Sequence, residues 1–357
     1  MNLTFLNTDQ NNFSNYLLEW YKINKRDLPW RNTKNPYKIW LSEVILQQTK
    51  ISQGLPYYIK FVNKFPNVSK LAYASEQEIL KMWEGLGYYS RARNLHKTAK
   101  IVIRDYNGIF PNNFDELIKL PGIGDYTASA ISSFSINEIN PVIDGNVYRF
   151  FSRLIGIKTP INSYKSLNEF KKIGYKLISK TNPSEFNQAI MDYGSLICTP
   201  KSPNCLECLY KNSCFANLNQ KIHEYPVKNK KLKIKIRFFN FLVINLAERG
   251  TLIEKRIKKD IWQNLYQFPL IESKKILSKK EIIDQLNKMN LFKNNYSYRL
   301  YLYQNKSFNY KLTHQLINSF FWIVEVNNID QNFVEVKKLN TFPFPKPITK
   351  FLDNYNW

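Results

Sequence analysis

The hydrophobic pattern of the chain changes near residue 238. Before that point an apolar residue recurs every three or four positions, the spacing of one helical face, over residues 13–22, 114–118, 128–134 and 147–154. After it the apolar residues gather in short runs typical of strands, at 238–246, 252–257 and 319–326, with a turn at 248–251 and one helical stretch near 281–289. The pattern predicts an all-α N-terminal part followed by an α+β domain.

Two of the helical stretches are joined by Leu120-Pro121-Gly122-Ile123-Gly124. Pro121 ends the first stretch, and two glycines one residue apart permit positive φ angles before the second begins, which predicts a helix–hairpin–helix. A backbone without side chains can approach a ligand closely, and the N–H groups that open the second helix point outward, so a phosphate can dock there. On the glycines alone, an ordinary interhelical turn is the favoured interpretation.

Asp144 stands where an N-cap belongs, between the apolar pair Val142-Ile143 and the helical stretch 147–154. The N–H groups and the dipole at a helix N-terminus stabilise a carboxylate, which predicts a lowered pKa for Asp144. Plain capping of the helix is the alternative.

Glu43 is unusual because Ser42 and Glu43 are the only polar residues in the run 39–46. It is either a surface residue on the polar face of a helix or a partly buried acid. In the second case desolvation raises its pKa and it can hold a proton near neutral pH. The run alone favours the surface position.

The charge and the cysteines restrict the class of protein. Lys and Arg number 52 against 28 Asp and Glu, a formal net charge of +24, which is typical of a polyanion binder, although AT-rich codon usage can account for part of the lysine content. The chain has no long apolar stretch and no signal peptide, so we expect a protein of the cytoplasm. All four cysteines lie within 198–214, which in a reducing compartment favours a metal over disulfides, with Zn²⁺ and a 4Fe-4S cluster both open.

These motifs together resemble the MutY-type adenine DNA glycosylases of the helix-hairpin-helix superfamily, which also contains endonuclease III. The run Leu41-Ser42-Glu43-Val44, followed by Leu46-Gln47-Gln48-Thr49, is similar to the family's signature, in which the glutamate is the catalytic acid. The aspartate after the hairpin serves the chemistry in this superfamily. The resemblance therefore implies catalytic roles for Glu43 and Asp144, with Tyr126 and Asn146 as supporting hydrogen-bonding residues.

The resemblance also implies DNA contacts and a cofactor. The implied DNA-binding residues are Trp30 and Arg31 at the adenine pocket, Gln48, Thr49, Leu86, Gly87 and Tyr88 inside the duplex, and Gly122 and Gly124 at a phosphate. The hairpin is also a candidate site for a monovalent cation. The spacing of Cys198, Cys205, Cys208 and Cys214 is the one with which these relatives bind a 4Fe-4S cluster.

The two carboxylates predict opposite roles in one reaction. Glu43 delivers a proton to an extruded adenine, and Asp144 stabilises the oxocarbenium-like sugar or traps it covalently. Bifunctional relatives carry a lysine where this chain has Tyr126, and a phenol cannot form a Schiff base, so we expect base removal without efficient strand cleavage. A pyrimidine mismatch glycosylase of the same fold and a weakened, non-catalytic lesion-binding protein are the alternatives.

The C-terminal part resembles the Nudix-like domain with which the family reads 8-oxoguanine. Thr313 and His314 match its recognition turn, but Leu312 stands where the family has an aromatic residue, and Asn264 replaces the glycine of a Trp-rich element. These departures predict weaker discrimination of 8-oxoguanine from guanine. The Glu-rich motif of a Nudix hydrolase is missing from the sequence, so we expect binding without hydrolysis.

The predicted organisation is an all-α, two-lobed glycosylase domain with a 4Fe-4S cluster loop over 1–225, a basic linker over 226–237, and an α+β Nudix-like domain over 238–357. Within the first domain we expect a six-helix-barrel-type lobe over about 32–140 and a cluster lobe formed by the N-terminal helix and about 141–216. The predicted partner is double-stranded DNA with adenine opposite 8-oxoguanine or guanine. We expect a monomer with no membrane partner, held at the nucleoid of a bacterial cytoplasm through DNA.

Overall fold

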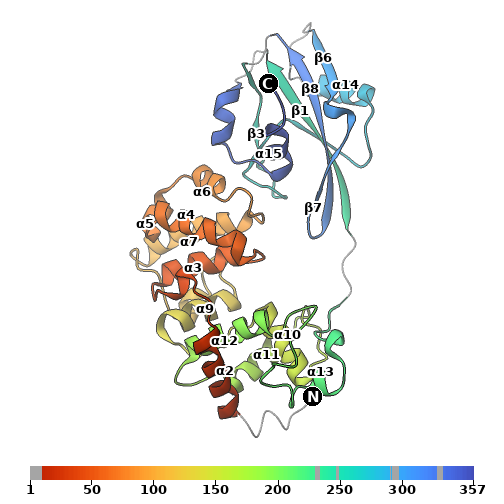
Figure 1. Ribbon diagram of the computed structural model, residues 1–357. Helices are drawn as coiled ribbons and strands as arrows, with labels where there is room; N and C mark the ends of the chain where they lie inside the picture. The colour runs from red at the N-terminus through yellow and green to blue at the C-terminus, as the bar shows by residue number, and fades with distance from the viewer. Residues whose placement is uncertain (1–9, 230–233, 247–248, 290, 292–296, 328–332) are drawn as a thin grey trace. The chain divides into compact units, whose positions relative to one another are not determined.

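The computed structural model of the protein describes residues 10–229, 234–246, 249–289, 291, 297–327 and 333–357. The chain forms two compact units, one of residues 1–73 and 94–230 and the other of residues 74–93 and 231–357 (Figure 1). In the described part, no helix is both long and apolar enough to span a membrane.

The described residues of the first unit form helices and connecting loops, as the hydrophobic pattern predicts. The helices are α2 (Gln10–Asn24), η1 (Pro29–Arg31), α3 (Pro36–Leu46), α4 (Ile51–Lys64), α5 (Val68–Tyr73), α7 (Ser90–Asp105, whose first four residues belong to the second unit), α8 (Phe114–Leu117), α9 (Asp125–Ile136), α10 (Gly145–Ile155), α11 (Ser166–Leu177), α12 (Pro183–Leu196), α13 (Phe215–Leu218) and η2 (Ile222–Glu224). Helix α2 packs against α12, α3 against α9 and α10 against α12 (Figure 1). Phe13, Phe150 and Phe186 lie at the centre of one core of this unit.

The loop from α9 to α10 is fixed by a buried amide. Asn187 on α12 accepts a hydrogen bond from Val142 N at 3.1 Å, and its side-chain nitrogen donates to Asn140 O at 2.8 Å. Asn187 is 1% exposed, so these bonds are shielded from water. They hold the segment that leads directly to Asp144.

The second unit is built on a seven-stranded mixed sheet in the order β6-β8-β1-β2-β9, in which β5 also pairs with β1 and β7 with β8 (Figure 1). The long strands β1 (Lys235–Leu246) and β8 (Gln315–Val326) are parallel and pair along their whole length, from Lys235↔Gln315 to Leu246↔Val326. The other elements are α6 (Glu76–Met82), β2 (Gly250–Thr251), β3 (Glu254–Lys255), β4 (Tyr266–Gln267), β5 (Leu270–Ser273), α14 (Lys279–Lys288), β6 (Tyr298–Leu302), η3 (Tyr303–Asn305), β7 (Phe308–Lys311), β9 (Val334–Glu335), η4 (Val336–Thr341) and α15 (Lys346–Leu352).

The alternation of side chains along the strands gives the sheet two apolar faces. Leu242 and its neighbours on one face pack with Ile282 and Leu286 of α14. On the other face Phe321 stacks on Phe351 of α15, with ring centroids 4.3 Å apart. The α+β prediction for this domain is therefore confirmed.

Three details of the C-terminal prediction differ from the structure. The strand expected over 252–257 is only β3 (Glu254–Lys255), and β4, β5, β6, β7 and β9 were not expected. The predicted basic linker ends inside β1, where the guanidinium of Arg237 is buried and pairs with Asp260 and Glu272, both at 2.7 Å. The run of basic residues looked like a linker because the acidic partners of Arg237 lie far away along the sequence. The predicted turn over 248–251 begins at a residue outside the described part, and Gly250 and Thr251 form β2.

Residues 74–93 join the second unit through specific polar contacts. Asn264 Nδ2 donates to Glu76 Oε1 at 2.8 Å, and Arg93 Nη1 donates to Gln263 O at 2.8 Å. Asn264, which stands where the resembled family has a glycine, has a φ of 66°, the left-handed region that asparagine tolerates better than most residues. The turn therefore keeps the conformation that a glycine would favour.

Candidate active site

One pocket of about 520 Å³ lies within the first unit. Its walls come from η1, α3, α9, α12 and the residues that open α10. It brings together seven of the residues singled out in the sequence: Trp30, Arg31, Glu43, Thr49, Tyr126, Asp144 and Asn146.

Glu43 is a buried acid and not a surface residue, so the second interpretation of its apolar run is correct. It lies on α3, whose N-terminus is capped by Asn35, and it is 6% exposed. The Tyr126 hydroxyl donates to its Oε2 at 2.7 Å. Burial, with a smaller contribution from the charge of Asp144, raises the pKa of Glu43 to about 7, although the Tyr126 bond and Arg31 oppose the rise.

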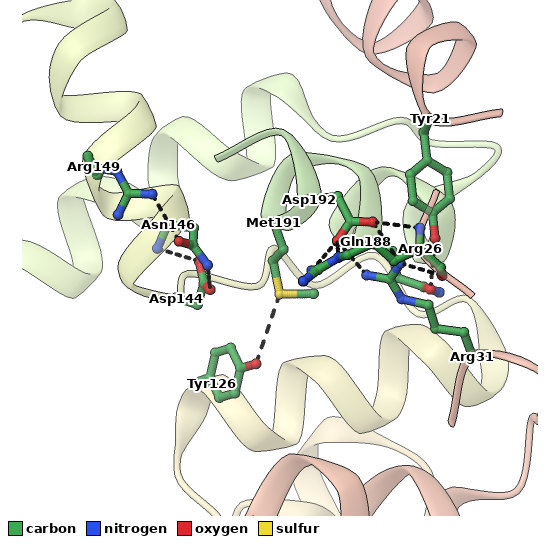
Figure 2. Close-up of polar contacts among 10 residues, drawn as sticks. All are labelled: Tyr21, Arg26, Arg31, Tyr126, Asp144, Asn146, Arg149, Gln188, Met191 and Asp192. Carbon is green, nitrogen blue, oxygen red and sulfur yellow. Dashed lines mark hydrogen bonds and ion pairs between the residues drawn. The ribbon is translucent and has the colours of Figure 1, made fainter. Parts of the chain in front are cut away.

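Asp144 caps α10, as predicted. Its Oδ1 accepts from Asn146 N at 2.9 Å and Val147 N at 2.7 Å, and its Oδ2 accepts from Asn146 Nδ2 at 2.7 Å (Figure 2). The predicted fall in its pKa is wrong. Burial in the pocket raises the pKa of Asp144, and these three bonds together with Arg149 oppose the rise without reversing it.

Arg149 connects the Asp144 side of the pocket to the cysteine loop. Its Nη2 donates to Asn146 Oδ1 at 2.9 Å, and its Nε donates to Cys198 O at 2.6 Å. The side chain of Asn146 thus accepts from Arg149 and donates to Asp144, which fixes its amide orientation (Figure 2). The sequence gave no reason to single out Arg149, because its partners lie in separate segments.

The opposite wall carries two arginines around one acid. Arg31 forms a bidentate pair with Asp192, from Nη1 to Oδ2 and from Nη2 to Oδ1, both at 2.7 Å, and Arg26 Nε donates to Oδ1 at 2.8 Å (Figure 2). Gln188 lies on the same helix as Asp192 and accepts from the Tyr21 hydroxyl at 3.1 Å. Trp30 is buried and meets Tyr58 edge to face. Arg26, Gln188 and Asp192 were not predicted from the sequence.

A usable signal for this wall did exist in α12. Gln188, Met191 and Ser195 line the pocket and are spaced as one helical face, three and then four residues apart. The sequence could not show that this face meets η1, because that requires the packing of α12 beside the loop after α2.

One of the two hairpin glycines adopts the positive φ that both residues permit. Gly122 has a φ of 78°, and a Cβ there would meet Asn94 Cβ at 2.7 Å, so this position requires glycine. Gly124 is extended, with a φ of −94°, and a Cβ there would meet nothing within 4 Å. Gly124 is the N-cap of α9 and has ordinary backbone geometry. Both glycines are exposed.

The remaining predicted DNA contacts lie outside the pocket lining. Gln48 is exposed and has a φ of 58°, and Tyr88 is 51% exposed with a φ of 47°, two strained conformations of the kind found at functional sites. Leu86 is buried, and Gly87 has a φ of 72°. Thr313 and His314 are exposed in the turn between β7 and β8, and the hydroxyls of Thr313 and Tyr88 are hydrogen-bonded.

The four cysteines are free and line one small cavity beside α10. Arg153 Nη1 lies 3.4 Å from Cys198 Sγ, and the Tyr193 hydroxyl donates to Cys208 Sγ at 3.2 Å. Within the part of the chain that the structure describes, no three His, Cys, Asp or Glu side chains converge as ligands of one metal ion.

Comparisons with known proteins agree with this arrangement. Residues 41–174 match the model of the HhH-GPD superfamily of base excision DNA repair proteins, and residues 240–354 match that of the NUDIX domain. The chain is 36% identical over 343 residues to the adenine DNA glycosylase of Buchnera aphidicola subsp. Schizaphis graminum (strain Sg), covering 96% of this chain and 98% of the relative. It is 41% identical over 304 residues to that of Buchnera aphidicola subsp. Baizongia pistaciae (strain Bp), covering 82% and 84%.

A similar solved structure is that of a thermostable thymine-DNA glycosylase. It superimposes with a TM-score of 0.56 at 27% identity and covers 60% of this chain and 99% of the other. The predicted fold class, a helical helix-hairpin-helix part with a Nudix-like C-terminal part, is therefore confirmed.

Proposed function

The chain belongs to the adenine DNA glycosylase family, and from its pocket we propose that it hydrolyses the N-glycosidic bond of adenine paired with 8-oxoguanine or guanine in double-stranded DNA. The observation that carries this proposal is the pair of carboxylates on one pocket. Glu43 has a pKa of about 7, and Asp144 accepts three N–H bonds. Two carboxylates in different environments are what acid-assisted glycoside cleavage requires.

In the proposed reaction Glu43 gives its proton to the extruded adenine, at N7. The C1′–N9 bond then breaks, and its electron pair leaves with the base. Asp144, as the carboxylate, stabilises the positive charge that develops on the sugar. Water adds to C1′ and returns a proton to Glu43, so the products are adenine and an abasic site.

The Tyr126 phenol supports base removal without efficient strand cleavage. It donates to Glu43 at 2.7 Å, and it occupies the sequence position at which bifunctional relatives carry a lysine. A phenol forms no imine with the sugar, so no Schiff-base route to strand incision starts here.

Three polar side chains suit a purine in the pocket. Arg26, Arg31 and Gln188 line the wall opposite Asp144 and offer guanidinium N–H groups and one amide. Trp30 on the same wall offers an apolar ring beside them. We assign base recognition to these four residues.

We propose that the cysteine cavity is the site of a 4Fe-4S cluster. Cys198, Cys205, Cys208 and Cys214 would hold it, since all four are free thiols around one cavity and two of them receive side-chain donors. When bound, the cluster would cross-link the loop through iron–thiolate bonds. Arg149 would then hold Asn146 against a rigid loop.

The DNA itself would be held at several exposed points. We assign a phosphate contact to the backbone at Gly122 and Gly124, and entry into the duplex to Gln48, Thr49 and Tyr88. Thr313 and His314 are the candidates for contact with the base opposite adenine. A substantial positive charge favours each of these contacts with a polyanion.

A panel of short duplexes tests the proposal under single-turnover conditions. The duplexes carry adenine opposite 8-oxoguanine, guanine or thymine, and thymine opposite guanine. Release of adenine from the first two, with an intact strand until alkali is added, is the expected result. Release of thymine from thymine opposite guanine would instead support the reaction named for the similar solved structure, and duplex binding without any product would support a non-catalytic lesion binder.

A further inference from the structure

Asp192 lies behind the pocket wall rather than in it. Its side chain is 0% exposed, and it does not line the pocket, whereas both of its arginine partners do. Burial would raise the pKa of this carboxyl, but the bonds from Arg31 and Arg26 hold it below its usual range, so Asp192 is a buried anion between two cations.

The first consequence concerns the orientation of the Arg31 side chain. The bidentate pair with Asp192 fixes the plane of the Arg31 guanidinium, and Arg31 Nη1 also donates to Arg26 O at 3.2 Å. The N–H groups that these bonds do not use therefore point in fixed directions. A purine edge brought into the pocket meets donors whose orientation is already set.

The second consequence is electrostatic. The groups that act on Glu43 are Tyr126 on α9, Asp144 before α10 and Arg31 on η1. The positive charge of Arg31 favours loss of the Glu43 proton, which is the proton that the reaction needs. Asp192 binds that charge directly and so reduces the field that Arg31 exerts on Glu43.

We propose that Asp192 is a positioning residue that orients Arg31 and Arg26 toward the extruded base and offsets the Arg31 charge that faces Glu43. The inference rests on the proposed function, because it assumes that adenine enters this pocket. It adds a role for a side chain that contacts neither the base nor the sugar.

The test compares Asp192→Asn, Asp192→Glu and a matched control, Asp260→Asn, in the full chain. Asp260 also lies between two arginines, Arg237 at 2.7 Å and Arg256 at 3.1 Å, but it belongs to the second unit and is absent from the pocket lining. The measurements are the single-turnover rate of adenine release from pH 5 to 9 and the duplex Kd.

For Asp192→Asn we expect a rate lowered roughly 10- to 100-fold near neutral pH and a duplex Kd within about twofold of the original value, because DNA affinity comes mainly from phosphate contacts. The alkaline limb of the pH profile moves to lower pH by up to roughly one unit, since an unbalanced Arg31 favours ionised Glu43. In Asp192→Glu we expect the alkaline limb to return most of the way to its original pH. In Asp260→Asn we expect both the rate and the pH of this limb to be unchanged.

The position of the limb does not depend on how much of the variant is folded, so partial misfolding does not obscure the result. An unmoved limb in Asp192→Asn, with normal excision by the original chain, overturns this inference alone. A limb that moves equally in Asp260→Asn also overturns it. Absence of excision by the original chain overturns the proposed function and this inference with it.

Discussion

Glu43 and Asp144 face the same pocket but are held by different kinds of structure. Glu43 lies in the last turn of α3 and meets one hydroxyl, that of Tyr126. Asp144 precedes α10 and meets three N–H donors, two of them from the backbone. Burial raises the pKa of both acids; one hydroxyl hydrogen bond opposes the rise at Glu43, and three N–H hydrogen bonds oppose it at Asp144.

This contrast shows that burial alone does not decide which carboxyl group donates a proton and which acts as an anion. A carboxylate with three N–H donors keeps favourable partners for its charge even when water is scarce. A carboxylate with one hydroxyl neighbour loses more by ionising, so it holds its proton to about pH 7. The number and type of donors therefore separate the two roles in the proposed reaction.

Replacement of Glu43 gives the largest expected effect. Glu43→Gln keeps the shape of the side chain but cannot transfer a proton, so adenine release should fall by roughly 10²- to 10⁴-fold. Single-turnover assays measure the rate, and fluorescence anisotropy checks that duplex binding is unchanged. Glu19→Gln, a change at an exposed acid paired with Lys22, serves as the control with normal turnover. Retained turnover in Glu43→Gln would refute the acid assignment.

Replacement of Asp144 tests the other half of the contrast. Asparagine is also a good N-cap, so Asp144→Asn preserves much of the start of α10 and removes the negative charge. We expect adenine release to fall by roughly 10²- to 10³-fold, with duplex binding intact. Circular dichroism checks that the helices remain. A nearly normal rate would mean that the charge of Asp144 does not act on the sugar.

The support given by Asn146 can be removed without touching either carboxylate. Asn146→Ala deletes the 2.7 Å bond to Asp144 and leaves Arg149 without its 2.9 Å acceptor, so the pKa of Asp144 rises further. Because the reaction needs Asp144 ionised, activity is lost as the pH falls through its pKa, and the acid limb moves to higher pH. We expect a rate lowered by about tenfold at neutral pH, as one charge-assisted hydrogen bond is worth roughly 1.5 kcal/mol or more. A shift of the alkaline limb instead would contradict the assignment.

The sequence predicted the helices and caps of this site better than the pKa values of its carboxyl groups. Helical periodicity placed the N-cap at Asp144, and an apolar run placed Glu43 on a helix, both from local pattern alone. The capping argument failed for the pKa of Asp144 because it describes a helix end in water, whereas this end forms part of a pocket wall. Local pattern contains no information on that depth.

The residues that the sequence did not reveal share one property. Arg149 and Asp192 act through partners brought together by packing between distant segments, such as Cys198 for the first and Arg26 for the second. Arg237 in the second unit is similar, since its acidic partners come from other segments. A charged residue inside a local polar pattern is indistinguishable from a solvated one until the fold supplies its partner.

We expect the smallest effect for Tyr126→Phe. The direction in which the pH profile moves shows which of the two carboxylates the Tyr126 hydroxyl acts on. The Tyr126 hydroxyl bond lowers the pKa of Glu43, so its removal lets that pKa rise above about 7. Because the reaction needs Glu43 protonated, activity is lost as the pH rises through its pKa, and the alkaline limb moves to higher pH. The rate near neutral pH should change by no more than roughly tenfold, the value of one neutral hydrogen bond.

Adenine release from pH 5 to 9 measures both limbs, and Tyr16→Phe, a change at an exposed tyrosine, is the control. An alkaline limb displaced to lower pH would show that Tyr126 supports the protonated form of Glu43, which would reverse the role that its hydrogen bond has in this contrast.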